Sequence, residues 1–292
     1  MSLPEFVHLM PADLKDACAL LAQFPGEAKA LAGGTDMLVK MKQRRMVPRY
    51  LVNLKKIPGL DYVRPEPGGG LAIGPLASIE ALRSSLDVRN SYRVLHDAVS
   101  RMGTMEIRNC GTLAGNLCNA SPAAETVPAL LLLGASVRVV SKDSDWSLPV
   151  EGFILGPGKT LLETGQLVAE IRLPEPPADS FGAYDKFSLR RMDLALVGAG
   201  VLLTMSGGVC REAKIVLSSV APAALRARNA EAMLAGKALE DRLIDKAARC
   251  AAEEVRPQAD LFGTVEQKRN MAAALTARVL RQALERSGKA GN

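Results

Sequence analysis

The sequence predicts an α+β protein of two domains. Strand-like and helix-like runs mix irregularly up to about residue 173, and a proline-rich segment follows at 174–180. Three strand-like runs then precede three helix-like ones. This order of elements predicts two α+β domains with a boundary near residue 177. We therefore expect one domain at 1–177 and a second at 178–292.

The first domain is expected to contain several short elements. Apolar residues recur at helical spacing in 12–23, which predicts a helix there, and Pro122 suits the first turn of a later helix. The predicted strands are 5–8, 29–32, 50–54, two within 60–74 that a glycine-rich turn joins, 135–141, 147–154 and 166–174. The predicted helices are 12–23, 37–42, 78–85, 88–102 and 122–134.

The second domain follows the segment Pro-Glu-Pro-Pro-Ala-Asp-Ser at 174–180, whose composition is typical of a linker. Strands are expected at 181–190, 195–205 and 209–219. Helices are expected at 226–235, 240–254 and 265–286, and their many charges indicate a solvated face.

Composition narrows the class of protein. The chain has 292 residues, of which 48% are hydrophobic, so it can bury a sizeable core. Aromatic residues make up only 4%, which disfavours a surface that stacks nucleic-acid bases. The net charge of +6 is mild and spread along the chain, so we expect no nucleic-acid partner, while an anionic ligand stays open.

Targeting signals and metal motifs are not evident. The first residues lack a basic region followed by a long apolar block, and the apolar run at 127–137 is shorter than the roughly 20 residues of a membrane helix. We expect a cytoplasmic protein without a membrane span. Five scattered cysteines without a CxxC pair, and only two histidines, predict no metal site or cluster on this chain.

Two stretches are poor in side chains. The first, LAGGTDMLV at 31–39, places two glycines between a predicted strand and a predicted helix. Glycine admits positive φ and lets a ligand approach the backbone, and amides at such a turn suit a phosphate. The alternative is a tight turn without a ligand. We call residues 30–37 the first glycine bend.

The second stretch, CGTLAGNLCNASPAAE at 110–125, is expected to form a loop before the helix at Pro122. Its short polar side chains suit phosphate or ribose oxygens, and the Glu125 carboxylate suits sugar hydroxyls. The alternative is a capped loop. We call residues 110–121 the second glycine bend. Because a diphosphate takes donors from more than one side, we expect both bends to converge on one such group.

Two familiar nucleotide motifs do not fit. GPGKTLL at 156–162 is similar to the end of a P-loop, but Phe153 stands where the P-loop needs its first glycine. No GxGxxG follows a predicted strand, so a Rossmann site is not indicated. Lys186, in a predicted strand past the linker, is either an ordinary surface lysine or a cation near a cofactor's anionic edge.

The pairing of LAGGTDMLVKMK with IRNCGTLAGNLCNASPAAETVPALLLLGA resembles the FAD-binding subunits of the molybdenum hydroxylase family, which includes xanthine dehydrogenases and carbon monoxide dehydrogenases. The similarity extends over nearly the whole chain. It implies a PCMH-type FAD-binding domain of two α+β subdomains, then a small domain with a three-stranded antiparallel sheet and helices. FAD is expected between these parts.

The resemblance also implies which residues bind FAD. Both bends hold the pyrophosphate, Glu125 binds ribose hydroxyls, and Gly103, Val168 and Lys186 match further flavin-contacting positions. Because a cation lowers the energy of the negative form, Lys186 is expected to stabilise the anionic reduced flavin. Ala114 replaces a usual glycine, which is tolerable at negative φ, and Glu125 stands where aspartate is commoner. The full expected set is Ala30, Leu31, Ala32, Gly33, Gly34, Thr35, Asp36, Met37, Gly103, Thr112, Gly115, Asn116, Glu125, Val168 and Lys186.

The family further implies partners and a role. A large molybdenum–pterin subunit and a small iron–sulfur subunit are expected, two copies of each of the three chains, with molybdopterin and the iron–sulfur clusters on the partners. Electrons would pass from the clusters to FAD and on to an external acceptor, with no catalytic side chain on this chain. The alternatives are a stand-alone flavin-dependent oxidase or dehydrogenase, and a phosphate-binding scaffold.

Overall fold

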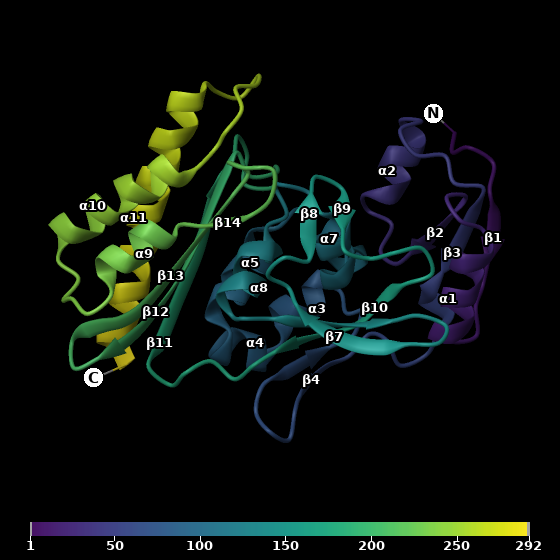
Figure 1. The fold of residues 1–292 in the computed structure, drawn as a ribbon, viewed down its shortest axis with the longest axis horizontal. Helices are drawn as coiled ribbons and strands as arrows, with labels where there is room; N and C mark the ends of the chain where they lie inside the picture. The colour runs from purple at the N-terminus through teal and green to yellow at the C-terminus, as the bar shows by residue number, and fades with distance from the viewer. Residues whose placement is uncertain (1, 291–292) are drawn as a thin grey trace.

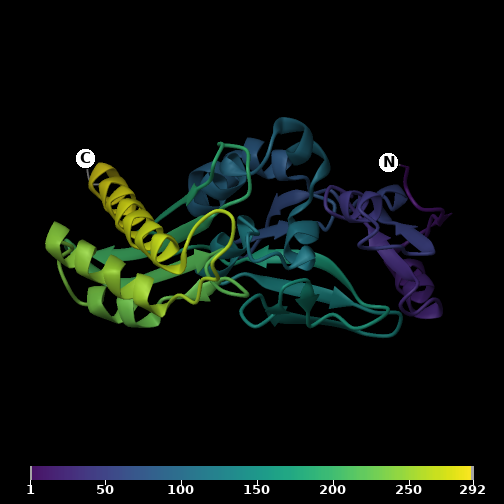
Figure 2. The same cartoon turned by 90° about the horizontal axis from the view of Figure 1, so that it is seen from above.

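The computed structural model describes residues 2–290 as an elongated molecule (Figure 1). The N-terminal elements lie at one end and the C-terminal helices at the other, with a large mixed region between them (Figures 1 and 2). This arrangement is the mixed α+β class that the sequence predicts.

A small parallel sheet forms the first subdomain. Its strands β1 (Val7–Leu9), β2 (Ala28–Leu31) and β3 (Tyr50–Asn53) lie in the order β1-β3-β2. Helix α1 (Leu14–Gln23) starts at Asp13, whose side chain accepts the Asp16 amide at 2.8 Å. Helix α2 (Met37–Lys42) and a 3₁₀ turn, η1 (Leu54–Lys56), complete this part.

The second subdomain is built on a five-stranded antiparallel sheet with the order β4-β5-β10-β6-β7. Its elements are β4 (Val63–Pro65), β5 (Leu71–Ile73), α3 (Ile79–Ser84), α4 (Leu86–Ser91), α5 (Arg93–Arg101), α6 (Met105–Cys110), α7 (Leu113–Asn119), α8 (Thr126–Leu132), β6 (Ser136–Val140), β7 (Asp145–Pro149), the hairpin β8 (Ile154–Gly156) and β9 (Lys159–Thr160), and β10 (Leu167–Leu173).

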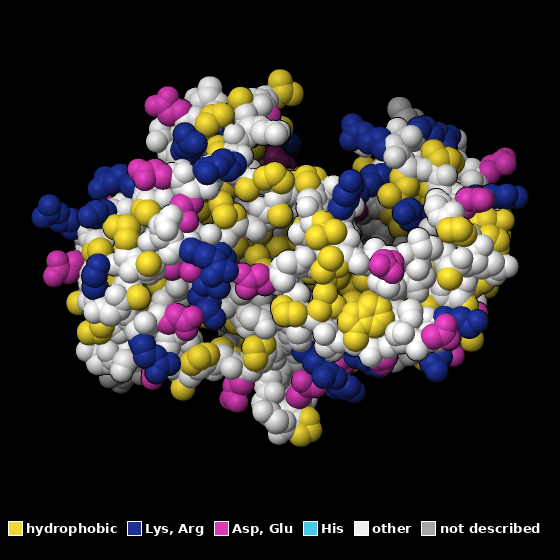
Figure 3. All heavy atoms as spheres, in the orientation of Figure 1, with side chains coloured by type: hydrophobic (Ala, Val, Ile, Leu, Met, Phe, Trp, Pro, Cys, Tyr) yellow, Lys and Arg dark blue, Asp and Glu magenta, His cyan; other side chains and the backbone are white. Residues whose placement is uncertain are grey.

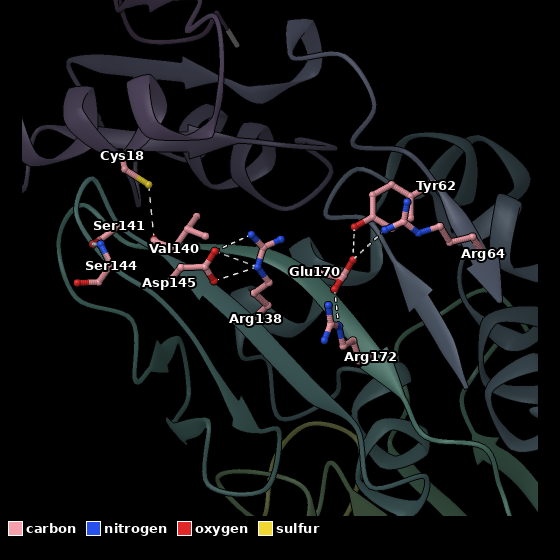
Figure 4. A network of polar contacts seen from close by, with 10 residues as sticks. All are labelled: Cys18, Tyr62, Arg64, Arg138, Val140, Ser141, Ser144, Asp145, Glu170 and Arg172. Atoms are coloured by element: carbon pink, nitrogen blue, oxygen red, sulfur yellow. Dashed lines mark hydrogen bonds and ion pairs between the residues drawn. The ribbon is translucent and has the colours of Figure 1, made fainter. Parts of the chain in front are cut away.

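Two groups of polar contacts lie on this sheet, one around Glu170 and Tyr62 and one between Arg138 and Asp145 (Figure 4). Glu170 on β10 is almost fully buried and accepts hydrogen bonds at 2.5 Å from Tyr62 Oη and from Arg172 Nε. Burial raises the pKa of the Tyr62 hydroxyl to about 12, and the bond to Glu170 adds to the shift. Arg138 pairs with Asp145 across β6 and β7. The buried carboxylate is thereby compensated within the sheet.

Three local predictions were wrong. The run expected as a loop holds α7 and the end of α6, and the helix expected from Pro122 begins only at Thr126. The helix expected at 88–102 belongs to two helices, α4 and α5, that meet at Tyr92 (φ −118°, ψ 52°). A left-handed residue, Ala120 (φ +47°), ends α7, and this turn delays the start of α8.

The C-terminal domain has three long antiparallel strands, as expected, and a two-residue edge strand besides. These are β11 (Ser180–Phe187), β12 (Val197–Ser206), β13 (Val209–Ser218) and β14 (Leu225–Arg226), in that order. Helices α9 (Arg228–Leu234), α10 (Asp241–Glu254) and α11 (Val265–Ala290) pack together on one face (Figures 1 and 2). The predicted division near residue 177 falls between the end of β10 and the start of β11 and stays a prediction.

The opposite face of this sheet packs on α5 and α8 of the second subdomain. Two glycines mark close approaches: a Cβ on Gly200 of β12 would lie 2.8 Å from Leu132 Cδ1 of α8, and a Cβ on Gly182 of β11 would lie 2.8 Å from Val94 Cβ of α5. Real Cβ atoms do not approach other atoms so closely, so a side chain at either position would force its neighbour to move. The two domains are therefore in tight contact.

Candidate functional site

A cavity of about 650 Å³ separates the first subdomain from the second. Figure 3 shows the surface hollowed between the N-terminal end and the middle of the molecule, with Lys and Arg side chains near the rim. Among the described residues, those that line the cavity all lie between 21 and 168, in the first domain. Its volume is within the range of about 300–1,000 Å³ that is usual for small-molecule and cofactor sites.

The two glycine bends meet at this cavity, in backbone contact. A Cβ on Gly33 would lie 2.2 Å from the Cys110 carbonyl oxygen and 2.9 Å from Gly111 Cα. A Cβ on Gly111 would in turn lie 3.5 Å from Thr35 Oγ1 of the first bend. Only glycine fits at position 33 without moving the second bend. The convergence expected from the sequence is thus present.

Short side chains fix the shape of the second bend. Thr112 caps α7, and its Oγ1 accepts the Gly115 amide at 3.0 Å. Thr126 Oγ1, at the start of α8, donates to Asn116 Oδ1 at 2.6 Å. Ala114 lies within α7, whose helical backbone has negative φ, so its methyl group is tolerated as expected.

One hydrogen bond crosses from the first subdomain to the second beside the cavity. Lys40 Nζ, on α2, donates to Asn119 Oδ1, on α7, at 2.6 Å, and both residues line the cavity. Lys40 is not among the residues expected from the sequence to bind the cofactor. The sequence feature that could have indicated Lys40 is its position one turn after Asp36, in the helix that follows the first bend. Two exposed lysines, Lys29 and Lys159, also line the cavity.

Most of the residues expected to bind the cofactor line this cavity. Those in the lining are Ala30, Leu31, Ala32, Gly33, Gly34, Thr35, Asp36, Met37, Thr112, Gly115, Asn116 and Val168. Gly103, Glu125 and Lys186 are not in the lining. For every residue of the expected set, direct contact with the cofactor stays a prediction.

Gly103 lies beside the lining residue Met102 and has φ +49°. Arg108 holds this segment: it donates to the carbonyl oxygens of Met102 at 3.2 Å and Gly103 at 3.1 Å. Glu80 on α3 accepts from Arg108 Nε at 2.7 Å and also pairs with Arg83. The hydrogen bond from Arg83 and, against the effect of burial, that from Arg108 lower the pKa of Glu80 to about 2.

Glu125 and Lys186 form an ion pair with each other. Lys186 Nζ, on β11, donates to Glu125 Oε1 and also, at 2.7 Å, to the Asp193 carbonyl oxygen. The two side chains are only 3% and 2% exposed. Burial raises the pKa of the Glu125 carboxyl, and the Lys186 charge opposes that shift. The pair joins the second subdomain to the C-terminal sheet, a contact that the sequence analysis did not foresee.

The cavity suits a nucleotide that carries a diphosphate. Two bends without large side chains expose backbone to the ligand, and three lysines bring positive charge. Two carboxylates, Asp36 and Glu163, also line it, so the five charged residues of the lining sum to +1. Leu31, Met102 and Val168 supply apolar wall. Together the fold and the cavity define a protein that binds an anionic organic cofactor between two α+β subdomains.

Comparison with known families identifies that cofactor. Residues 4–176 match the FAD binding domain in molybdopterin dehydrogenase, and residues 182–283 match the CO dehydrogenase flavoprotein C-terminal domain. The first match alone covers more than half of the chain, so the chain belongs to the family of FAD-binding subunits of molybdenum hydroxylases. It is therefore a flavoprotein subunit of the oxidoreductase class, as the sequence motifs predicted.

Individual relatives agree over almost the full length. The carbon monoxide dehydrogenase medium chain of Hydrogenophaga pseudoflava is 31% identical over 97% of this chain and 98% of its own. The solved carbon monoxide dehydrogenase from Hydrogenophaga pseudoflava superposes with a TM-score of 0.94 at 33% identity, covering 98% of this chain and 99% of that one. Quinoline 2-oxidoreductase from Pseudomonas putida 86 gives 0.93 at 28% identity, over 98% and 99%.

The helices were also compared with the requirements of a lipid bilayer. Within residues 2–290, no helix combines the length and the apolar character that a membrane crossing needs.

Proposed function

We propose that this chain receives electrons from the iron–sulfur clusters of a small partner subunit and passes them, through FAD, to an external acceptor. A large molybdenum–pterin subunit of the same complex oxidises the organic substrate. The observation that carries the proposal is the backbone contact between the two glycine bends at one cavity. Relatives called medium chains of carbon monoxide dehydrogenase support the multi-subunit context.

The chain's own residues hold and orient the cofactor. The amides and short side chains of both bends would hold the diphosphate, and Met102 and Val168 would give the cofactor an apolar wall that limits access of water. FAD, when bound, supplies the electron-transfer chemistry. The protein contributes position and electrostatics, and none of its side chains needs to act as an acid, base or nucleophile in this role.

The assembly is part of the proposal. We expect two copies of each of three subunits, with molybdopterin and the clusters on the partners, and a cytoplasmic complex. Kinship supports this stoichiometry, and the organic substrate differs among relatives: one name specifies carbon monoxide and another quinoline. The substrate of the complex therefore depends on the large subunit rather than on this chain.

An absorption spectrum of the purified chain tests cofactor binding, and co-expression with its neighbouring subunits tests the role. We expect the isolated chain to show flavin bands and to leave organic substrates unoxidised. In the assembled complex, substrate should bleach those bands, and an added acceptor should restore them. Substrate turnover by the isolated chain would instead indicate a stand-alone oxidase. Colourless protein, alone and in the complex, would overturn the proposal.

A further inference from the structure

We propose that Lys40 is the cation that binds the diphosphate of FAD in this cavity and that Asn119 orients its ammonium group. The inference rests on the proposed function, because it needs FAD to occupy the cavity between the two subdomains. It adds a cofactor-binding residue outside the two glycine bends, on the helix that follows the first of them.

The position of Lys40 is the first argument. Its Cα belongs to the first subdomain, whereas its Nζ lies 2.6 Å from Asn119 Oδ1 of the second. The ammonium group thus lies between the two subdomains. Lys40 lines the same cavity as residues of both bends. A diphosphate gripped by both bends would be close to this wall. The long side chain therefore carries its charge to the place where the two halves of the site meet.

The charge of Lys40 is the second argument. Among the described residues, no carboxylate lies within 4 Å of its ammonium, while the buried Lys186 and Lys268 are each paired with an acid. Asn119 is a neutral acceptor, so it orients the ammonium without cancelling its charge. An ammonium has three N–H donors, and Asn119 takes one of them. Two donors and a full positive charge remain for an anionic ligand.

A comparison within the same cavity separates Lys40 from the other lysines. Lys29 and Lys159 also line it, but both side chains are exposed, and neither bonds to a described residue across the cavity. Lys40 is half-buried and held in one position. A partly desolvated, oriented cation interacts with a phosphate more strongly than an exposed, mobile one. Lys42, an exposed lysine of α2 that does not line the cavity, is therefore the matched control.

Fluorescence titration of the cofactor-stripped chain with FAD tests the assignment. Lys40→Met should raise the dissociation constant by about ten- to a hundredfold, the size of one charge-assisted hydrogen bond, and flatten its salt dependence. Lys40→Arg should retain most of the affinity. Lys42→Met, on the same helix but outside the cavity lining, should change the constant by less than about twofold, since an exposed charge contributes little. ADP carries the same diphosphate, so Lys40→Met should weaken the binding of ADP as well as that of FAD. ADP should therefore displace FAD from this variant less readily than the loss of FAD affinity alone would predict.

Asn119→Ala distinguishes a direct role from a merely structural one. If Lys40 contacts the diphosphate, Asn119→Ala should weaken FAD several-fold less than Lys40→Met does, and both variants should melt near the wild-type temperature. Equal losses in the two variants, accompanied by lower melting temperatures, would show that the bond only joins the subdomains and would overturn the inference. So would wild-type affinity in Lys40→Met. If the wild-type chain bound no FAD at all, the proposed function itself would fail.

Discussion

At the scale of single residues, Gly33 is the most constrained position in the cavity wall. Its backbone lies against the Cys110 carbonyl group, and a methyl group there would stand 2.2 Å from that oxygen. Backbone cannot yield as a side chain can, so any substitution must push the two bends apart. The close contact that shapes the cavity therefore depends on a missing side chain.

Gly33→Ala should weaken FAD binding by at least about tenfold and destabilise the fold by about 1–3 kcal/mol, as overpacking usually does. Flavin titration and urea unfolding measure the two effects. Gly68→Ala is the control, because Gly68 has open space around its Cα. Wild-type affinity in Gly33→Ala would show that the bends can separate without harm to the site.

Lys186 is the second informative residue, since its removal would leave the buried Glu125 without its partner. We expect Lys186→Met to lower the free energy of unfolding by about 3–5 kcal/mol at pH 7. The deficit should shrink at acid pH, because a protonated Glu125 needs no counter-charge. Adding Glu125→Gln to Lys186→Met should restore part of the loss. A single variant as stable as the wild type would contradict the structural role.

At the scale of elements, the Glu80–Arg108 pair fastens α6 to α3 and so fixes the segment that enters the second glycine bend. Arg83 shares the same carboxylate. Helix α6 ends at Cys110, whose carbonyl oxygen lies against Gly33. The Glu80–Arg108 pair therefore stabilises the backbone that forms this wall of the cavity. The contribution of this pair to the stability of the fold requires that the Glu80 carboxyl is ionised.

The pKa of Glu80 is lowered to about 2 in the fold, against about 4.3 in an unfolded chain. A depressed pKa adds stability that is complete above the unfolded value and disappears as pH falls through the folded value. Glu80→Gln should therefore be less stable than wild type at pH 7, and the difference should diminish below about pH 4. Chemical unfolding at several pH values measures it, with the exposed Glu5→Gln as control. A difference that stayed constant down to pH 3 would rule out this linkage.

The elements also show how much of the fold could be predicted from the sequence. The α+β class, the three long C-terminal strands and the paired bends followed from periodicity and glycine placement. The helical form of 113–119 did not, because alanine, glycine and asparagine suit loops and short helices alike, and Thr112 decides for helix through its cap. Lys40 and the Glu125–Lys186 pair escaped prediction because only the tertiary fold brings their partners together.

At the scale of the whole molecule, the FAD-binding domain and the C-terminal sheet pack closely at Gly200. Gly200→Val would drive its side chain into Leu132 of α8. We expect a loss of about 1–3 kcal/mol in stability and faster proteolysis within 174–180, because the domains would separate more often. Gly288→Ala, at an open position of α11, is the control. Unchanged protease sensitivity in Gly200→Val would show that the contact between β12 and α8 can accommodate the larger side chain.

Because the wall of the cavity needs Gly33 and Cys110 side by side, neither half of the first domain can form the cavity by itself. Binding of a cofactor in this cavity should therefore report that both subdomains of the first domain have folded. By mass action, a ligand at about 100 times its dissociation constant adds about 2.7 kcal/mol to the native state. The chain without FAD should accordingly unfold at a lower temperature than the chain with FAD bound.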